Sequence, residues 1–155
     1  MKYKISVKSN SESDTIKIAE KLSEIVKISD FICLEGTLGM GKSVFARGFI
    51  QHQTDAMEVP SPTFTLVQSY EGDNYDIFHY DLYRIKNAEE IFEIGMEDMI
   101  YEGVSLVEWP SKMEAYLPNN RIEVTIDGKD DTREITFELS DKNKFEQIEE
   151  FIEKL

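Results

Sequence analysis

The sequence has one cysteine, few basic residues and no long apolar run, and each shortage excludes a class of protein. Because Cys33 is the only cysteine, no disulfide can form within the chain, and we expect a reducing compartment. No segment approaches the length of a transmembrane helix, and residues 1–8 lack the apolar stretch of a signal peptide. We therefore expect a cytoplasmic protein with no membrane partner.

Acidic residues outnumber basic ones, with 31 Asp and Glu against 17 Lys and Arg and a formal net charge of −14. Such a charge repels a nucleic-acid backbone, so we do not expect the chain to bind RNA or DNA unaided. The acidic excess either suits a basic partner protein or only keeps the protein in solution. With 155 residues and 41% hydrophobic content, residues 1–155 are predicted to form a single domain.

A glycine-rich stretch from Glu35 to Ser43, EGTLGMGKS, matches the pattern G-x-x-x-x-G-K-[ST] of a phosphate-binding P-loop. The apolar run from Phe31 to Leu34 is suited to a buried parallel strand, and the residues from Ser43 to Ile50 have helical spacing. Strand, glycine loop and helix is the context that the motif requires. The pattern therefore predicts a nucleotide-binding α/β fold of the P-loop NTPase-like kind.

The loop contains the residue types that hold a polyphosphate. Its glycines permit positive φ, so that successive backbone N–H groups can point at phosphate oxygens. The Lys42 ammonium is expected to reach the β- and γ-phosphates, and the Ser43 hydroxyl to bind Mg²⁺. The nucleotide-binding residues predicted in the loop are Gly36, Thr37, Leu38, Gly39, Met40, Gly41, Lys42 and Ser43.

Asp81 and Glu108 each follow a short apolar run that is suited to a strand. Ligands of open α/β sheets collect at the carboxyl ends of the strands, and Mg²⁺ prefers oxygen ligands in octahedral geometry. We predict that Glu108 holds the metal, directly or through water, and that Asp81 orients the hydrolytic water or the metal's ligands. The alternative is that both are ordinary solvent-exposed carboxylates at strand ends.

The remaining patterns predict a mixed sheet flanked by helices, with antiparallel hairpins. Residues 3–7 alternate like a strand, Ser11 is placed to cap a helix, and residues 142–155 form a final amphipathic helix. One hairpin is expected from residues 63–70 and 75–80, and another from residues 121–126 and 133–139 around Asp127 and Gly128. A short helix is expected from Ala88 to Ile94, ended by Gly95.

The segment from Ser61 to Thr65 follows the P-loop helix and contains three hydroxyl side chains. It is either an ordinary proline turn or a switch segment that contacts Mg²⁺ or the γ-phosphate, and we favour the switch. His79 is typical of a packed or hydrogen-bonded structural residue, because no Ser/His/Asp set accompanies it. Trp109 is expected to pack beside the site or to meet a partner.

Three other functions are compatible with a P-loop. A small-molecule kinase usually needs a lid carrying arginines, and the arginines of this chain are few and dispersed. A GTPase would read guanine with N-K-x-D, whereas the only similar stretch, NKFE at residues 143–146, belongs to the predicted final helix. A third possibility is an interaction module whose nucleotide only stabilises its shape.

Four blocks together resemble the TsaE family, formerly YjeE. They are the P-loop, SPTFTLV at residues 61–67, FHYDLYR at residues 78–84 and VEW at residues 107–109, and they occur in the order and spacing of the family. The resemblance covers nearly the whole chain. It implies a small P-loop ATPase that uses ATP and Mg²⁺ in the threonylcarbamoylation of tRNA adenosine, and that docks on the TsaD–TsaB heterodimer, meeting tRNA only through that complex.

The resemblance also assigns roles to single residues. Lys42, Asp81 and Glu108 match the catalytic positions, and Ser43 and Glu108 match the metal-associated ones. Glu12 and Arg133 fall at positions that resemble nucleotide contacts. The chain departs from the family at three P-loop positions, which hold Thr37, Met40 and Ser43 where aspartate, alanine and often threonine are common. These changes keep the backbone cradle and the hydroxyl.

Overall fold

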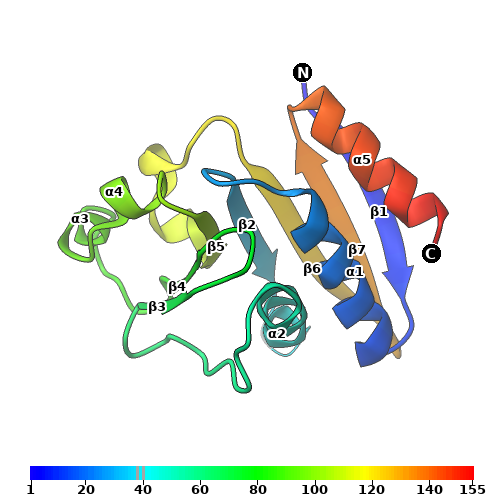
Figure 1. The fold of residues 1–155 in the computed structure, drawn as a ribbon, viewed down its shortest axis with the longest axis horizontal. Helices are drawn as coiled ribbons and strands as arrows, with labels where there is room; N and C mark the ends of the chain where they lie inside the picture. The colour runs from blue at the N-terminus through cyan, green and yellow to red at the C-terminus, as the bar shows by residue number, and fades with distance from the viewer. Residues whose placement is uncertain (38, 40) are drawn as a thin grey trace.

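The computed structural model describes residues 1–37, 39 and 41–155, all with their side chains except Lys129. Two of the predicted P-loop residues, Leu38 and Met40, lie outside the described residues. The described part of the chain forms one seven-stranded sheet between helices (Figure 1). Its strands are β1 (Tyr3–Ser9), β2 (Phe31–Gly36), β3 (Val67–Tyr70), β4 (Ile77–Asp81), β5 (Val104–Glu108), β6 (Ile122–Lys129) and β7 (Thr132–Leu139).

The strand order is β1-β7-β6-β2-β5-β4-β3. The four central strands β6, β2, β5 and β4 are parallel, while β1, β7 and β3 pair with their neighbours in antiparallel fashion. The predicted α/β fold with a mixed sheet and antiparallel hairpins is therefore confirmed. Because β2 lies in the middle of the sheet, the P-loop that follows it opens at the centre of one sheet edge.

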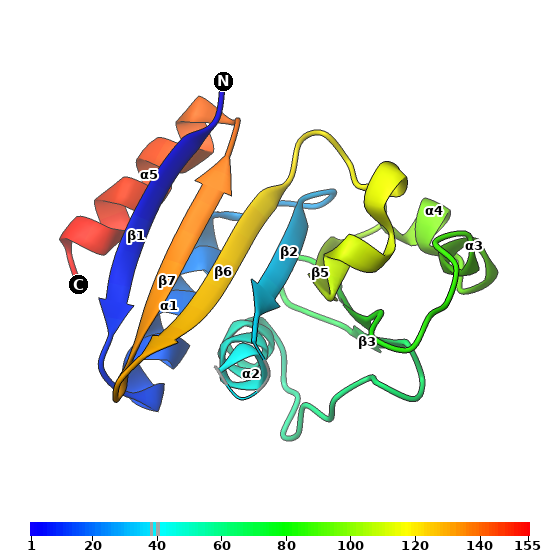
Figure 2. The same cartoon turned by 180° about the vertical axis from the view of Figure 1, so that it is seen from behind.

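Three long helices cover one face of the sheet: α1 (Glu12–Ile25), α2 (Lys42–Gln53) and α5 (Lys142–Glu153). The opposite face carries shorter pieces over its β2-β5-β4 half, namely α3 (Glu90–Glu93), α4 (Met96–Met99) and the 3₁₀ turns η1 (Pro110–Lys112) and η2 (Glu114–Tyr116). Figure 2 shows β1, β7 and β6 on that face with no described helix in front of them.

Burial on both faces of the sheet explains the continuous apolar run at the start of β2. Ile32 and Leu34 pack into the larger core beneath α1 and α2, whereas Phe31 and Cys33 pack into a smaller core on the other face. A strand that is buried on both faces needs apolar residues at successive positions. The helix before it begins as predicted, because the Ser11 hydroxyl accepts a hydrogen bond from the Asp14 N–H at 3.1 Å.

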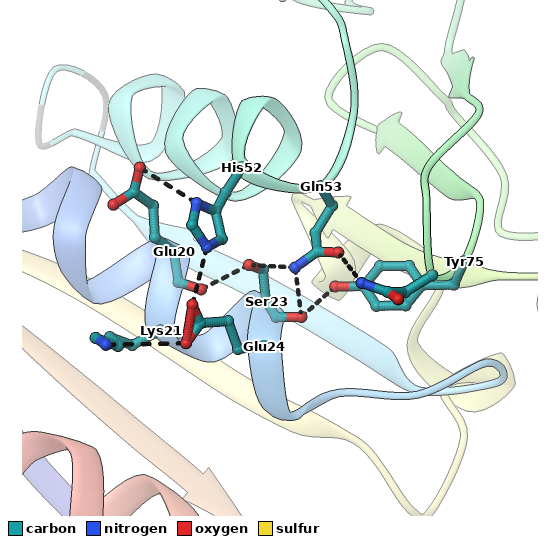
Figure 3. A network of polar contacts seen from close by, with 8 residues as sticks. Glu20, Lys21, Ser23, Glu24, His52, Gln53 and Tyr75 are labelled. Atoms are coloured by element: carbon teal, nitrogen blue, oxygen red, sulfur yellow. Dashed lines mark hydrogen bonds and ion pairs between the residues drawn. The ribbon is translucent and has the colours of Figure 1, made fainter.

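Polar contacts fix the end of α2 against α1 (Figure 3). The Gln53 amide donates to the Ser23 carbonyl and hydroxyl at 3.3 and 3.2 Å, and the Tyr75 hydroxyl donates to the same carbonyl. On the exposed side, His52 Nε2 lies 2.9 Å from a carboxylate oxygen of Glu24. The helix that begins at the P-loop is thus anchored at its far end.

One predicted strand and one predicted turn lie elsewhere than expected. The strand expected over residues 63–70 begins only at Val67, because Leu66 adopts a φ of 69° and its N–H bonds to the Pro62 carbonyl at 2.6 Å. The turn expected at Asp127 and Gly128 lies at residues 130–131 instead. Asp130 takes a φ of 58° there, which aspartate tolerates better than most residues.

The helix expected from Ala88 to Ile94 is shorter than predicted. It is confined to α3, and Gly95, with a φ of 76°, separates it from the further single turn α4. The glycine ends the helix as expected, but the chain then resumes helical geometry.

Candidate functional site

The glycines of the turn after β2 adopt backbone conformations that other residues rarely take. Gly36 has a φ of 144°, and a Cβ added there would lie 2.3 Å from the Ile126 carbonyl oxygen on β6. Gly41 has a φ of 106° and directly precedes the first residue of α2. The turn therefore lets β2 run close beside β6 and still enter the helix within a few residues.

Lys42 and Ser43 occupy the first turn of α2. Lys42 is buried, with 6% of its surface exposed, and its Nζ lies 4.1 Å from the centroid of the Trp109 ring. Trp109 lies beside the site, as expected, and is itself a left-handed residue, with a φ of 59°, directly before η1. Ser43 is exposed on the same turn. The ammonium is thus held at the mouth of the glycine turn by an aromatic face.

The two predicted carboxylates lie side by side. Asp81 ends β4 and Glu108 ends β5, and the parallel register pairs them directly. The same register places Glu108 beside Leu34 of β2, two residues before Gly36. Both acids are buried, with 5% and 7% of their surfaces exposed, so the alternative of ordinary solvent-exposed carboxylates is wrong. They converge on the sheet edge where the P-loop opens.

Each acid has a specific hydrogen-bond partner. Asp81 Oδ2 accepts a hydrogen bond from the Thr63 hydroxyl at 2.8 Å, and its Oδ1 accepts one from the Tyr83 N–H at 3.0 Å. Ser61 and Thr63 share a further hydroxyl contact of 2.7 Å. Glu108 Oε2 lies 2.7 Å from Nε2 of His79. The sequence prediction missed this last contact, which only the pairing of β4 with β5 reveals.

Glu35 lies directly before the first glycine of the turn. Burial raises the pKa of its carboxyl above the ordinary 4.5, and the nearby Glu123 carboxylate raises it further, while Arg121 and Lys42 act in the opposite direction. Glu35 lines a small pocket of about 120 Å³ together with Lys42 and Trp109. Burial and the Glu123 charge thus disfavour the ionised form of a carboxyl that lies beside the ammonium.

A pocket of about 210 Å³ adjoins the other side of the turn. It brings together Glu12 at the start of α1 and Arg133 at the start of β7, which are far apart in the sequence. Gly39, Gly41 and Asp131 also line it. Asp131 was not predicted, because its place in the pocket depends on a hairpin turn that the sequence put at Asp127 and Gly128.

The donor set fits a magnesium-bound nucleotide. Among the residues that the structure describes, no group of three or more His, Cys, Asp or Glu could hold a metal ion. Mg²⁺ at phosphates does not require one, since it takes one or two protein oxygens and completes its ligands with phosphates and water. The Ser43 hydroxyl and the Glu108 carboxylate are oxygens of this kind, and the pocket beyond Gly39 leaves room for a nucleoside.

The fold and the site define an α/β protein of P-loop NTPase-like character. The sequence profile of the family described as "Threonylcarbamoyl adenosine biosynthesis protein TsaE" matches residues 9–135. The chain belongs to the TsaE family, which takes part in the biosynthesis of threonylcarbamoyladenosine.

Relatives and a solved structure agree with this assignment. The "tRNA threonylcarbamoyladenosine biosynthesis protein TsaE" of Rickettsia conorii is 38% identical over 127 residues, which are 81% of this chain and 73% of that protein. The protein of the same name from Bacillus subtilis is 35% identical over 137 residues, 87% of this chain and 85% of its own. The crystal structure of Bacillus subtilis YdiB matches with a TM-score of 0.77 at 30% identity, covering 99% of this chain and 97% of that one.

Within residues 1–37, 39 and 41–155, no helix is both long enough and apolar enough to cross a bilayer.

Proposed function

We propose that this protein is a Mg²⁺-dependent ATPase that serves the threonylcarbamoylation of tRNA adenosine. The observation that carries the proposal is the convergence of the Gly36–Gly41 turn, the buried Lys42 and the paired acids Asp81 and Glu108 on one sheet edge. Family membership supports the pathway, and this geometry supports the chemistry.

In this proposal the loop amides and Lys42 bind the β- and γ-phosphates. Ser43 and Glu108 hold Mg²⁺, which when bound neutralises charge on the phosphates. The Asp81 carboxylate would accept a hydrogen bond from the attacking water and so orient it, or would help to position the ligands of Mg²⁺. Glu12 and Arg133 border the pocket that receives the nucleoside.

The hydroxyl contacts of Asp81 support the switch interpretation of residues 61–65. Thr63 is joined both to Ser61 and to Asp81, so the segment is already attached to the acid that would orient water. A γ-phosphate that attracts either hydroxyl changes the position of Asp81 as well. The same segment contains Phe64, whose side chain is 83% exposed. The bound nucleotide would thereby affect the position of an exposed aromatic side chain.

The partners in this proposal are TsaD and TsaB, and tRNA is met only through their complex. The net charge of −14 supports an indirect role, because it opposes direct contact with the tRNA backbone. The protein would act in the cytoplasm, where tRNA is modified.

Phosphate release from ATP tests the proposal, with and without TsaD–TsaB and with no acceptor present. We expect Lys42→Ala and Glu108→Ala each to lower the rate by about 100-fold or more, as is usual when a group that stabilises transferring phosphates is lost. Lys142→Ala, which removes an exposed lysine at the start of α5, is the control. Normal rates in both site variants would contradict the assignment.

Substrate competition separates the alternatives. Release of inorganic phosphate without any acceptor contradicts a small-molecule kinase. Preference for ATP over GTP contradicts a GTPase. An interaction module would bind the nucleotide, and formation of modified tRNA by TsaD–TsaB would then survive in the hydrolysis-deficient Glu108→Ala variant.

A further inference from the structure

His79 is a polar residue in a fully buried strand of the sheet. It lies on β4, all five residues of which are buried, and only 2% of its surface is exposed. Its register partner on β5 is Leu106, two positions before Glu108, and side chains two positions apart on a strand share a face. The imidazole therefore points along the sheet toward the Glu108 carboxylate.

The imidazole makes one hydrogen bond to the residues that the structure describes. Nε2 lies 2.7 Å from Glu108 Oε2, and because a carboxylate accepts, Nε2 carries the proton. Nδ1 is buried and has no partner among the residues that the structure describes. Within the described part of the chain, no second hydrogen bond competes with Glu108 for the orientation of the ring.

This arrangement gives the buried Glu108 carboxylate a partner, but at the cost of a second ring nitrogen that has none. The neighbours of His79 in β4 are Ile77, Phe78 and Tyr80, and an apolar residue at position 79 would continue the packing. Histidine instead leaves a ring nitrogen unpaired in the interior, which costs stability. What histidine supplies, and an apolar residue cannot, is the hydrogen bond that fixes one oxygen of Glu108.

We propose that His79 is a positioning residue that holds Glu108 so that its second oxygen, Oε1, faces the sheet edge as the metal ligand. The inference rests on the proposed function, because it assigns His79 a part in the same Mg²⁺ site. Hydrogen bonds from neighbouring groups fix the orientation of ligating side chains, and their loss typically lowers metal affinity by about 10- to 100-fold.

Three substitutions separate positioning from packing. His79→Gln keeps an N–H donor near the place of Nε2, whereas His79→Asn offers an amide that is too short to reach Glu108. His79→Leu fills the space without a donor. Thermal unfolding of each variant controls for the fold, and if His79→Leu does not fold, the comparison of Gln with Asn replaces it.

The measurement is ADP affinity by calorimetry, with and without Mg²⁺, on the full chain. We expect unchanged metal-free ADP affinity in all folded variants. The gain in affinity on adding Mg²⁺ should fall by about 10- to 100-fold in His79→Leu and His79→Asn, and recover in His79→Gln. In a Glu108→Gln background, His79→Leu should cause no further loss.

The outcomes are distinguishable. Equal Mg²⁺ dependence in the parent protein, His79→Leu and His79→Asn would overturn the positioning role while leaving the proposed function intact. An equal loss in His79→Gln and His79→Asn would also overturn it, because packing rather than the donor would then matter. A parent protein without Mg²⁺-dependent nucleotide binding would overturn the proposed function, and this inference with it.

Discussion

The Lys42 ammonium lies over the ring of Trp109, with 4.1 Å between Nζ and the ring centroid. A cation held on an aromatic face is stabilised by about 0.5–2 kcal/mol, depending on its exposure to water. A polyphosphate in the loop attracts the same ammonium with two or more negative charges. We therefore expect Lys42 to leave the Trp109 ring and contact the phosphates when a nucleotide binds.

Trp109 is the only tryptophan of the chain, so its emission reports on this contact. We predict that ATP with Mg²⁺ changes the intensity of tryptophan fluorescence, because Lys42 moves from the ring to the phosphates. Lys42→Met should abolish most of the change while leaving emission measurable. Titrating both proteins with ATP checks this, and a full response in Lys42→Met would contradict the exchange.

Replacing Thr63 by valine should affect both stability and activity. The substitution keeps the shape of the side chain but removes the donor to Asp81 Oδ2, leaving a buried carboxylate oxygen without that partner. We expect a loss of about 1–3 kcal/mol in the free energy of unfolding and slower ATP hydrolysis. Urea unfolding and phosphate release measure the two effects.

Thr136→Val is the matched control for that experiment. It breaks a hydroxyl pair with Ser6, 2.8 Å apart, on the exposed face of β1 and β7. The free energy of unfolding should change by less than about 0.5 kcal/mol, and the rate of ATP hydrolysis should stay the same. If Thr63→Val behaved like this control, Thr63 would have no role in holding Asp81.

Gly48 permits the close approach of α2 to α1. A Cβ at this position would lie 3.0 Å from Cα and 3.1 Å from the carbonyl oxygen of Ile16, so a backbone must move. Overpacking costs about 1–3 kcal/mol, while alanine gains about 1 kcal/mol in helix propensity. We predict that Gly48→Ala lowers the melting temperature by roughly 2–4 °C, measured by calorimetry. Gln51→Ala, an exposed change in α2, should shift it little, and an increase in Gly48→Ala would refute the close approach.

Burial raises the pKa of the Cys33 thiol from its ordinary 9.0 to about 12. At pH 8 the thiolate fraction is therefore about one in ten thousand, and the native protein should react with iodoacetamide only as fast as it unfolds. Because the folded pKa is the higher one, the contribution to stability is fully present below pH 9 and is lost as the pH rises toward 12.

Cys33→Ala should remove the loss of stability that the thiol causes above pH 9. Measuring the free energy of unfolding of both proteins between pH 8 and pH 11 checks this. Complete labelling of the native thiol within minutes at pH 8 would contradict the buried position of Cys33.

Short-range patterns predict much of this fold. The cap at Ser11, the apolar run of β2 and the glycine turn depend on neighbouring residues, and the structure places each as the sequence indicates. Asp81 and Glu108 are predictable for the same reason, since each ends an apolar strand and parallel strands share an edge. Their chemical roles stay predictions.

The features that the sequence does not predict depend on pairing between distant segments. The contact of His79 with Glu108 requires β4 and β5 to be neighbours, and no local pattern fixes that register. The place of Asp131 beside Glu12 requires the turn at Asp130, although Asp127 and Gly128 form the stronger local turn signal. In that hairpin, continued pairing of β6 with β7 outweighs the preference of two residues.

The pocket shared by Glu12, Asp131 and Arg133 joins an early helix to a late hairpin. A molecule bound in that pocket would contact both α1 and the β6–β7 hairpin. Local unfolding of either one would then require the bound molecule to dissociate. Protease protection by nucleotide should then extend over α1 and the β6–β7 hairpin together, well outside the glycine turn itself.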